Sequence, residues 1–164
     1  MDPARTPVII GVGQINDRTE DPFAAMDPVG LMVAALHAAD QDGGGGWMQA
    51  IDSLAVVDQI SFREMNPVVD AVAAGLGIAP AYRIQTPKPM GDSPARLLNE
   101  AANRIGSGES IVAAVVGAEA LRTAAKRAAA SGGDVDHNAM RIRQKGVAPT
   151  YRRRYGLTAP VDVY

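Results

Sequence analysis

Short strand-like runs alternate along the chain with longer segments whose apolar residues recur at helical spacing. The strand-like runs, mostly apolar and β-branched, are residues 8–13, 54–57, 82–86 and 111–116. The segments with helical spacing are residues 28–39, 67–76, 93–106 and 118–130. Strands that alternate with helices of this length predict crossover connections and a parallel sheet. The predicted fold class is therefore α/β, in the order β-α-β-α-β-α-β, with a parallel or mixed sheet and helices on both faces.

Three dipeptides predict where helices begin. In Asp27-Pro28, Asn66-Pro67 and Ser93-Pro94, a residue that caps helices precedes a proline suited to the first helical position. Glycines mark the predicted ends of the second and third helices: Gly75 or Gly77, and Gly106 with Gly108.

The strand-helix pattern stops near residue 131. Residues 1–130 are therefore predicted to form the α/β domain, and residues 131–164 an irregular, basic loop segment. The chain ends on Val161-Asp162-Val163-Tyr164, an alternating pattern that resembles the start of a further element. We expect an architecture that is truncated at this point.

Composition excludes several classes of protein. The chain has 164 residues, which is typical of one domain, and a formal net charge of -2, without the basic excess of a nucleic-acid binder. It has no cysteine, so thiolate metal sites and cysteine nucleophiles are excluded, and its two histidines make a multi-histidine metal site implausible. The N-terminus lacks the layout of a signal peptide, and no apolar run approaches the ~20 residues of a membrane span. We expect a soluble, cytoplasmic protein with no metal.

Gly11 and Gly13 begin a dinucleotide-binding pattern, G-x-G-x-x-G, but Asn16 occupies the third glycine position. A dinucleotide-binding turn must also lead directly into a helix, and here more than a dozen residues separate strand and helix. The sequence therefore favours a packing role, in which both glycines allow close backbone approach at the end of a strand.

Met90, Gly91, Asp92 and Ser93 lie where a predicted strand leads into a helix N-terminus. Ligands of parallel α/β sheets bind at such positions, and helix amides there can hold an anion or a developing oxyanion. Ser93 lacks a nucleophile-elbow motif and a histidine base, so it is interpreted as the helix cap. Asp92 or Glu119 could act as a general base, and a local pairing role is the alternative for Glu119.

Arginines make the C-terminal segment the most basic part of the chain. Arg141 and Arg143 are candidates for contacting the phosphates of a nucleotide-like ligand, and a weak nucleic-acid patch is a second functional interpretation of this segment. The alternative is a solvated loop whose charges balance the acidic remainder of the chain.

Residues 91–121, GDSPARLLNEAANRIGSGESIVAAVVGAEAL, resemble the N-terminal half of the thiolase superfamily. The opening RTPVIIGVGQ, residues 5–14, is similar to the first strand of that superfamily. Together they resemble the thiolase-like proteins described as acetyl-CoA acetyltransferases of the lipid-transfer-protein type. The resemblance implies lipid metabolism, acyl transfer on CoA thioesters, and a CoA or acyl-CoA ligand without any other cofactor.

The resemblance also places Gly91 at the family's nucleophilic cysteine. Glycine has no side chain, so the covalent acyl-enzyme step cannot occur there, and no catalytic residue is assigned. Two functions follow as hypotheses: binding of acyl-CoA or lipid acyl groups, through Met90, Gly91, Asp92, Ser93, Arg141 and Arg143, or a non-catalytic interaction subunit. An isolated thiolase half would expose apolar surface and a sheet edge, so we expect a homodimer or pairing with a partner chain.

Overall fold

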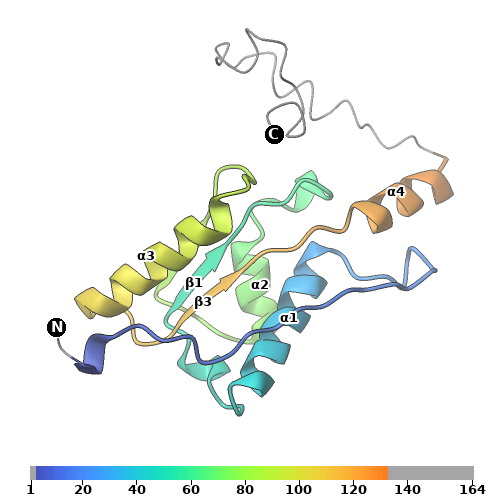
Figure 1. The fold of residues 1–164 in the computed structure, drawn as a ribbon. Coiled ribbons are helices and arrows are strands. Elements are labelled where there is room, and N and C mark those ends of the chain that lie inside the picture. Colours follow the sequence, from blue (N-terminus) through green and yellow to red (C-terminus); the bar gives the residue numbers. More distant parts are fainter. Residues whose placement is uncertain (1–2, 133–164) are drawn as a thin grey trace, which may run out of the picture. The chain divides into compact units, whose positions relative to one another are not determined.

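The computed structural model describes residues 3–132 (Figure 1). Arg141, Arg143 and the rest of the predicted basic segment lie outside the described residues. The described part contains these helices and strands: α1 (Pro28–Asp42), β1 (Ser53–Val56), α2 (Val69–Leu76), β2 (Tyr82–Gln85), α3 (Ser93–Ser107), β3 (Ala113–Val116) and α4 (Leu121–Ala130). Short 3-10 turns span Pro3–Arg5, Met48–Ala50 and Arg63–Met65.

The three strands form one parallel sheet in the order β2-β1-β3. Ser53 is in register with Tyr82 on one side and with Ala113 on the other. β1 is therefore the central strand, and all four of its side chains are buried. The α/β class and the parallel sheet predicted from the sequence are confirmed, and helices flank the sheet (Figure 1).

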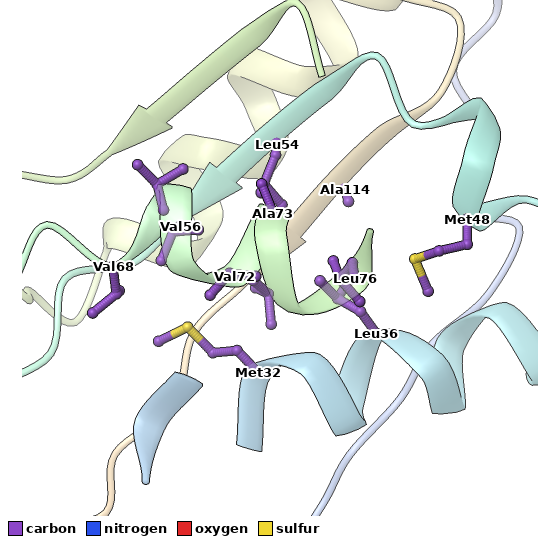
Figure 2. Close-up of a cluster of buried hydrophobic side chains, with 12 residues drawn as sticks. Met32, Leu36, Met48, Leu54, Val56, Val68, Val72, Ala73, Leu76 and Ala114 are labelled. Carbon is purple, nitrogen blue, oxygen red and sulfur yellow. The ribbon is translucent and has the colours of Figure 1, made fainter. Parts of the chain in front are cut away.

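The main core lies between the sheet and the helix pair α1 and α2. Alternate residues of β1 and β3 point to this face, and they pack against apolar side chains of both helices (Figure 2). The fully buried members are Met32, Leu54, Val56, Val68 and Val72. This packing is the principal source of the fold's stability, because burial of apolar side chains is the dominant favourable term in folding.

Two predicted helix starts are confirmed and one is wrong. The side chain of Asp27 accepts a hydrogen bond from Gly30 N at 2.8 Å and caps α1, and α3 begins at Ser93. Asn66-Pro67, however, does not open α2, which begins at Val69. Its first amides, those of Val68 and Val69, donate instead to Oε1 of Gln85 on β2, at 2.7 and 3.2 Å.

The predicted first strand is also wrong. Residues 8–13 pair with no described strand, and instead they cross α1. A Cβ on Gly11 would lie 2.1 Å from the carbonyl oxygen of Ala39, and one on Gly13 would lie 2.1 Å from that of Ala35. The two glycines therefore do permit close packing, but against a helix backbone rather than at the end of a strand.

α4 is held by polar contacts, and none of its residues is buried. Arg127 donates from Nε to Pro22 O at 2.7 Å and from Nη2 to Ala25 O at 2.9 Å, while Arg122 and Lys126 pair with Glu20. These contacts attach α4 to the loop that precedes α1.

Candidate functional site

A cavity of about 480 Å³ lies where β1 and β3 end and α3 begins. Most of its lining is apolar, and two carboxylates, Asp58 and Glu119, contribute to it. The residues that line it are Val57, Asp58, Pro89, Pro94, Leu98, Val115, Val116, Gly117, Ala118 and Glu119. This is the carboxyl edge of the parallel sheet, where ligands of open α/β folds bind.

The candidate residues Met90–Ser93 lie in the chain between Pro89 and Pro94, which both line this cavity, but none of the four is itself a lining residue. Gly91 is exposed, and a Cβ added to it would meet no atom within 4 Å. Met90 is 45% exposed, and Asp92 is also exposed. Position 91 therefore has open space for a side chain or a ligand.

Ser93 does not cap α3 as the sequence suggested. Asp92 occupies the N-cap position and makes no capping hydrogen bond with its side chain. Ser93 is only 1% exposed, and its Oγ accepts a hydrogen bond from Met90 N at 3.1 Å. The hydroxyl closes the turn before the helix, and its burial argues against a nucleophilic role.

The turn into α3 leaves backbone donors available. Within residues 3–132, no acceptor is found for the amides of Gly91, Asp92 and Ala95, whereas Arg96 N donates to Asp92 O at 3.0 Å. Free amides at a helix N-terminus carry the positive end of the helix dipole. Such donors can polarise a carbonyl or hold an anionic group.

Glu119 makes structural hydrogen bonds, but with a segment 58–59 residues away and not with the local neighbours that the sequence suggested. Its carboxylate accepts hydrogen bonds from Ile60 N at 2.8 Å and Ser61 N at 3.2 Å, and Ser61 Oγ accepts one from Ala120 N at 3.0 Å. These bonds join the loop after β1 to the segment after β3. Both oxygens of Glu119 are therefore occupied in fixing the wall of the cavity.

Asp58 is a cavity residue that the sequence reasoning missed. It is 5% exposed, its Oδ1 accepts from Gln85 Nε2 at 2.9 Å, and its amide donates to Thr86 Oγ1 at 2.8 Å. Its Oδ2 has no hydrogen-bond partner within the described residues. The available signal was its position, because it follows directly after the apolar run of the central strand.

Buried amide side chains support the same loop. Gln59 is fully buried and donates from Nε2 to Phe62 O at 2.6 Å and to Asn66 Oδ1 at 3.1 Å. Asn66 in turn donates from Nδ2 to Gln59 O at 3.0 Å. This network gives the loop after β1 a defined conformation at the edge of the cavity.

The comparisons with known proteins fit this architecture. No family model matches the sequence, and no curated protein matches it. Among solved structures, the chain is similar to a monomeric SCP2-thiolase-like protein type 1 from Mycobacterium smegmatis, with 31% sequence identity and a TM-score of 0.57. The fold is thiolase-like. The similarity covers 70% of this chain and 23% of that protein, so this chain spans less than a quarter of its solved neighbour.

Two general features of the described part bear on function. Within residues 3–132, no helix has both the length and the apolar character needed to cross a bilayer. In the same range, acidic and histidine side chains do not gather in a group of three or more that could hold a metal ion.

Proposed function

We propose that this thiolase-like chain binds acyl-CoA thioesters or lipid acyl groups at the start of α3, without forming a covalent acyl-enzyme. The observation that carries the proposal is the largely apolar cavity at the carboxyl edge of the sheet, whose lining includes Pro89 and Pro94 on either side of the α3 turn. Within that turn, the amides of Gly91 and Asp92 have no acceptor among the described residues. Its volume, about 480 Å³, lies within the range of about 300–1,000 Å³ usual for small-molecule sites.

The chemistry of a thioester fits this combination of groups. The acyl chain would occupy the space lined by Leu98, Val115 and Pro94, where burial of apolar surface supplies the binding energy. The thioester carbonyl would accept hydrogen bonds from the amides near Gly91. Arg141 and Arg143 remain our candidates for the phosphates of CoA.

The absence of a side chain at position 91 limits the reaction. Ser93 is buried and its hydroxyl is engaged with Met90 N, so it does not replace a missing nucleophile. The proposed role is therefore non-covalent binding, and acyl transfer of the thiolase type is not expected.

Calorimetric titration of the full chain tests this proposal. Acetyl-CoA and octanoyl-CoA are the ligands, and NADH is the control because it shares an adenine nucleotide but has no acyl group. Binding of the CoA esters without binding of NADH supports the proposal. Equal binding of all three would indicate nucleotide recognition instead, and no binding would reject an acyl-CoA site.

A second function, pairing with another polypeptide, is favoured by the edge of the sheet. β3 pairs with β1 alone among the described strands, and several large apolar side chains beside it are exposed. Val8 is 70% exposed, Ile9 78% and Ile111 84%. Unpaired edges flanked by apolar side chains are typical of surfaces that join another chain.

A further inference from the structure

Asp58 is a buried carboxylate with one oxygen that the described part of the protein leaves unused. The residue is 5% exposed, and it lines the cavity at the carboxyl edge of the sheet together with Pro94 and Leu98 of α3. Oδ1 accepts a hydrogen bond from Gln85 Nε2 at 2.9 Å, whereas the buried Oδ2 has no partner within residues 3–132. A buried acceptor without a donor costs free energy, so Oδ2 marks a position where a donor from a ligand would bind favourably.

The Asp58 carboxylate is held in place from the end of β2. Gln85 Oε1 accepts from two amides at the start of α2, at 2.7 and 3.2 Å, and this fixes which way the Gln85 amide group is turned. Its Nε2 therefore faces Asp58, and its two hydrogens go to Asp58 Oδ1 and to Asn66 Oδ1. Asp58 N also donates to Thr86 Oγ1 at 2.8 Å. Gln85 has no further hydrogen to donate, so these contacts fix Asp58 and leave Oδ2 open.

The cavity lining offers no side-chain donor for Oδ2. None of the lining residues is a lysine, an arginine or a histidine, and all of them except Asp58 and Glu119 are apolar. The carboxylate of Glu119 accepts from Ile60 N and Ser61 N, and an ionised carboxylate does not donate. A donor for Oδ2 on the cavity side must therefore come from the ligand.

We propose that the cavity selects acyl groups that carry a hydroxyl, whose O–H donates to Asp58 Oδ2. This inference rests on the acyl-binding function proposed above and names the class of acyl group that the site prefers. A hydroxyl is an uncharged donor that an acyl chain can carry into an apolar cavity, and it supplies the hydrogen that Oδ2 lacks. A saturated chain leaves Oδ2 unpaired, and a ketone places a second acceptor against it. Asp58 is thus a specificity-determining residue and takes no part in bond making.

Calorimetric titration of the full chain with CoA esters of equal acyl length tests this selection. The probes are octanoyl-CoA, 3-hydroxyoctanoyl-CoA and 7-hydroxyoctanoyl-CoA, whose hydroxyls lie toward the two ends of the acyl chain. The 3-oxo and 7-oxo esters are matched controls, because each places an acceptor where the hydroxyl places a donor. We expect one hydroxy ester to bind at least about tenfold more tightly than octanoyl-CoA, and its oxo counterpart to bind more weakly than octanoyl-CoA, since hydrogen bonds to charged groups are strong and unpaired buried acceptors are costly.

Two isosteric variants assign the effect to Asp58. Asp58→Asn keeps an acceptor for Gln85 but presents an N–H₂ group in place of Oδ2, so it donates where the parent chain accepts. We expect it to lose the preference for the hydroxy ester and to favour the oxo ester over octanoyl-CoA. The readout is the ratio of affinities within each variant, which a change in overall stability does not move. Asp70→Asn removes the same charge from an exposed residue of α2 that pairs with Arg83 and does not line the cavity, and it should keep the ranking of the parent chain.

Three results would overturn the inference. Equal affinity of the parent chain for all the esters would mean that Oδ2 meets no group of the ligand. Tighter binding of an oxo ester by the parent chain would mean that Asp58 donates instead of accepting. A hydroxyl preference that survives Asp58→Asn would assign that preference to another residue.

The same titrations separate failure of this inference from failure of the acyl-binding proposal. Binding of octanoyl-CoA without any preference for a hydroxyl rejects the role of Asp58 and leaves the acyl site standing. No binding of any ester rejects both. If Asp58→Asn does not fold, the ranking of the esters by the parent chain still decides, because it requires no variant.

Discussion

Replacing Gly13 with alanine tests how the N-terminal segment packs on α1. A Cβ at this position would lie 2.1 Å from Ala35 O and 2.6 Å from Ala39 N. Both are backbone atoms of a helix, so neither can rotate away as a side chain would. An ordinary contact of at least 3.4 Å requires the segment or the helix to move by about 1.3 Å.

The free-energy cost of the substitution depends on whether the N-terminal segment or α1 moves. Overpacking of a close contact costs about 1–3 kcal/mol. Val8 and Ile9 are mostly exposed, so lifting the segment from α1 forfeits little apolar burial and is the cheaper route. We therefore expect Gly13→Ala to lower the free energy of unfolding by about 1–2 kcal/mol, in the lower half of that range.

Urea unfolding followed by Trp47 fluorescence measures this change. Gly91→Ala is the matched control, because its Cβ meets no atom within 4 Å and its free energy of unfolding should change by less than about 0.5 kcal/mol. Equal unfolding midpoints for the two variants would refute the close packing of residues 11–13 on α1.

Three further predictions concern single contacts. Asp27→Ala removes the α1 cap and should lower the free energy of unfolding by about 1 kcal/mol in urea titration, whereas an unchanged midpoint would contradict the capping role. Gly77 has a φ of 66°, and a Cβ there would meet no atom within 4 Å, so only the left-handed backbone opposes a side chain. Gly77→Ala should therefore lower the free energy of unfolding by about 1–2 kcal/mol, measured by thermal unfolding, and an unchanged stability would refute the left-handed conformation. The Thr19 side chain, with the Met26 and Thr19 amides, lowers the pKa of Asp17 to about 2 from 3.8. The stability that this carboxylate contributes is therefore present above pH 3.8 and lost as pH falls through about 2. An NMR titration of Asp17 with a midpoint near 3.8 would contradict the lowered pKa.

Local patterns in the sequence were sufficient for most of the fold. The sheet strands and the caps at Asp27 and Gly108 depend on neighbouring residues, and each was predicted from periodicity or cap chemistry. The start of α2 was not, because its amides are satisfied by Gln85, a residue on a strand that comes later in the chain. No local pattern contains that contact.

Residues 8–13 show a second limit of periodicity. An apolar β-branched run predicts extended backbone, and that part is consistent with the structure. Whether the run joins a sheet depends on tertiary contacts that periodicity does not describe. Here Gly11 and Gly13 allow it to pack on the backbone of α1 instead. Within the candidate site, the position of residues 90–93 at the start of α3 was predictable. The buried carboxylate of Asp58 was missed, because its setting depends on hydrogen bonds with Gln85 and Thr86 at the end of β2.

The central claim, an acyl thioester site at the start of α3, is tested most directly by a cysteine placed at position 91. The parent chain has no cysteine, so Gly91→Cys and the control Asn103→Cys, about 15 Å along α3 from Ser93, each carry one reactive thiol. Bromoacetyl-CoA should modify Gly91→Cys at least about tenfold faster than Asn103→Cys because a bound acyl group lies beside position 91, and free CoA should protect it. Iodoacetamide, which has no CoA moiety, should not show this preference. If the two thiols differ by the same factor with both reagents, position 91 lies at no acyl-CoA site.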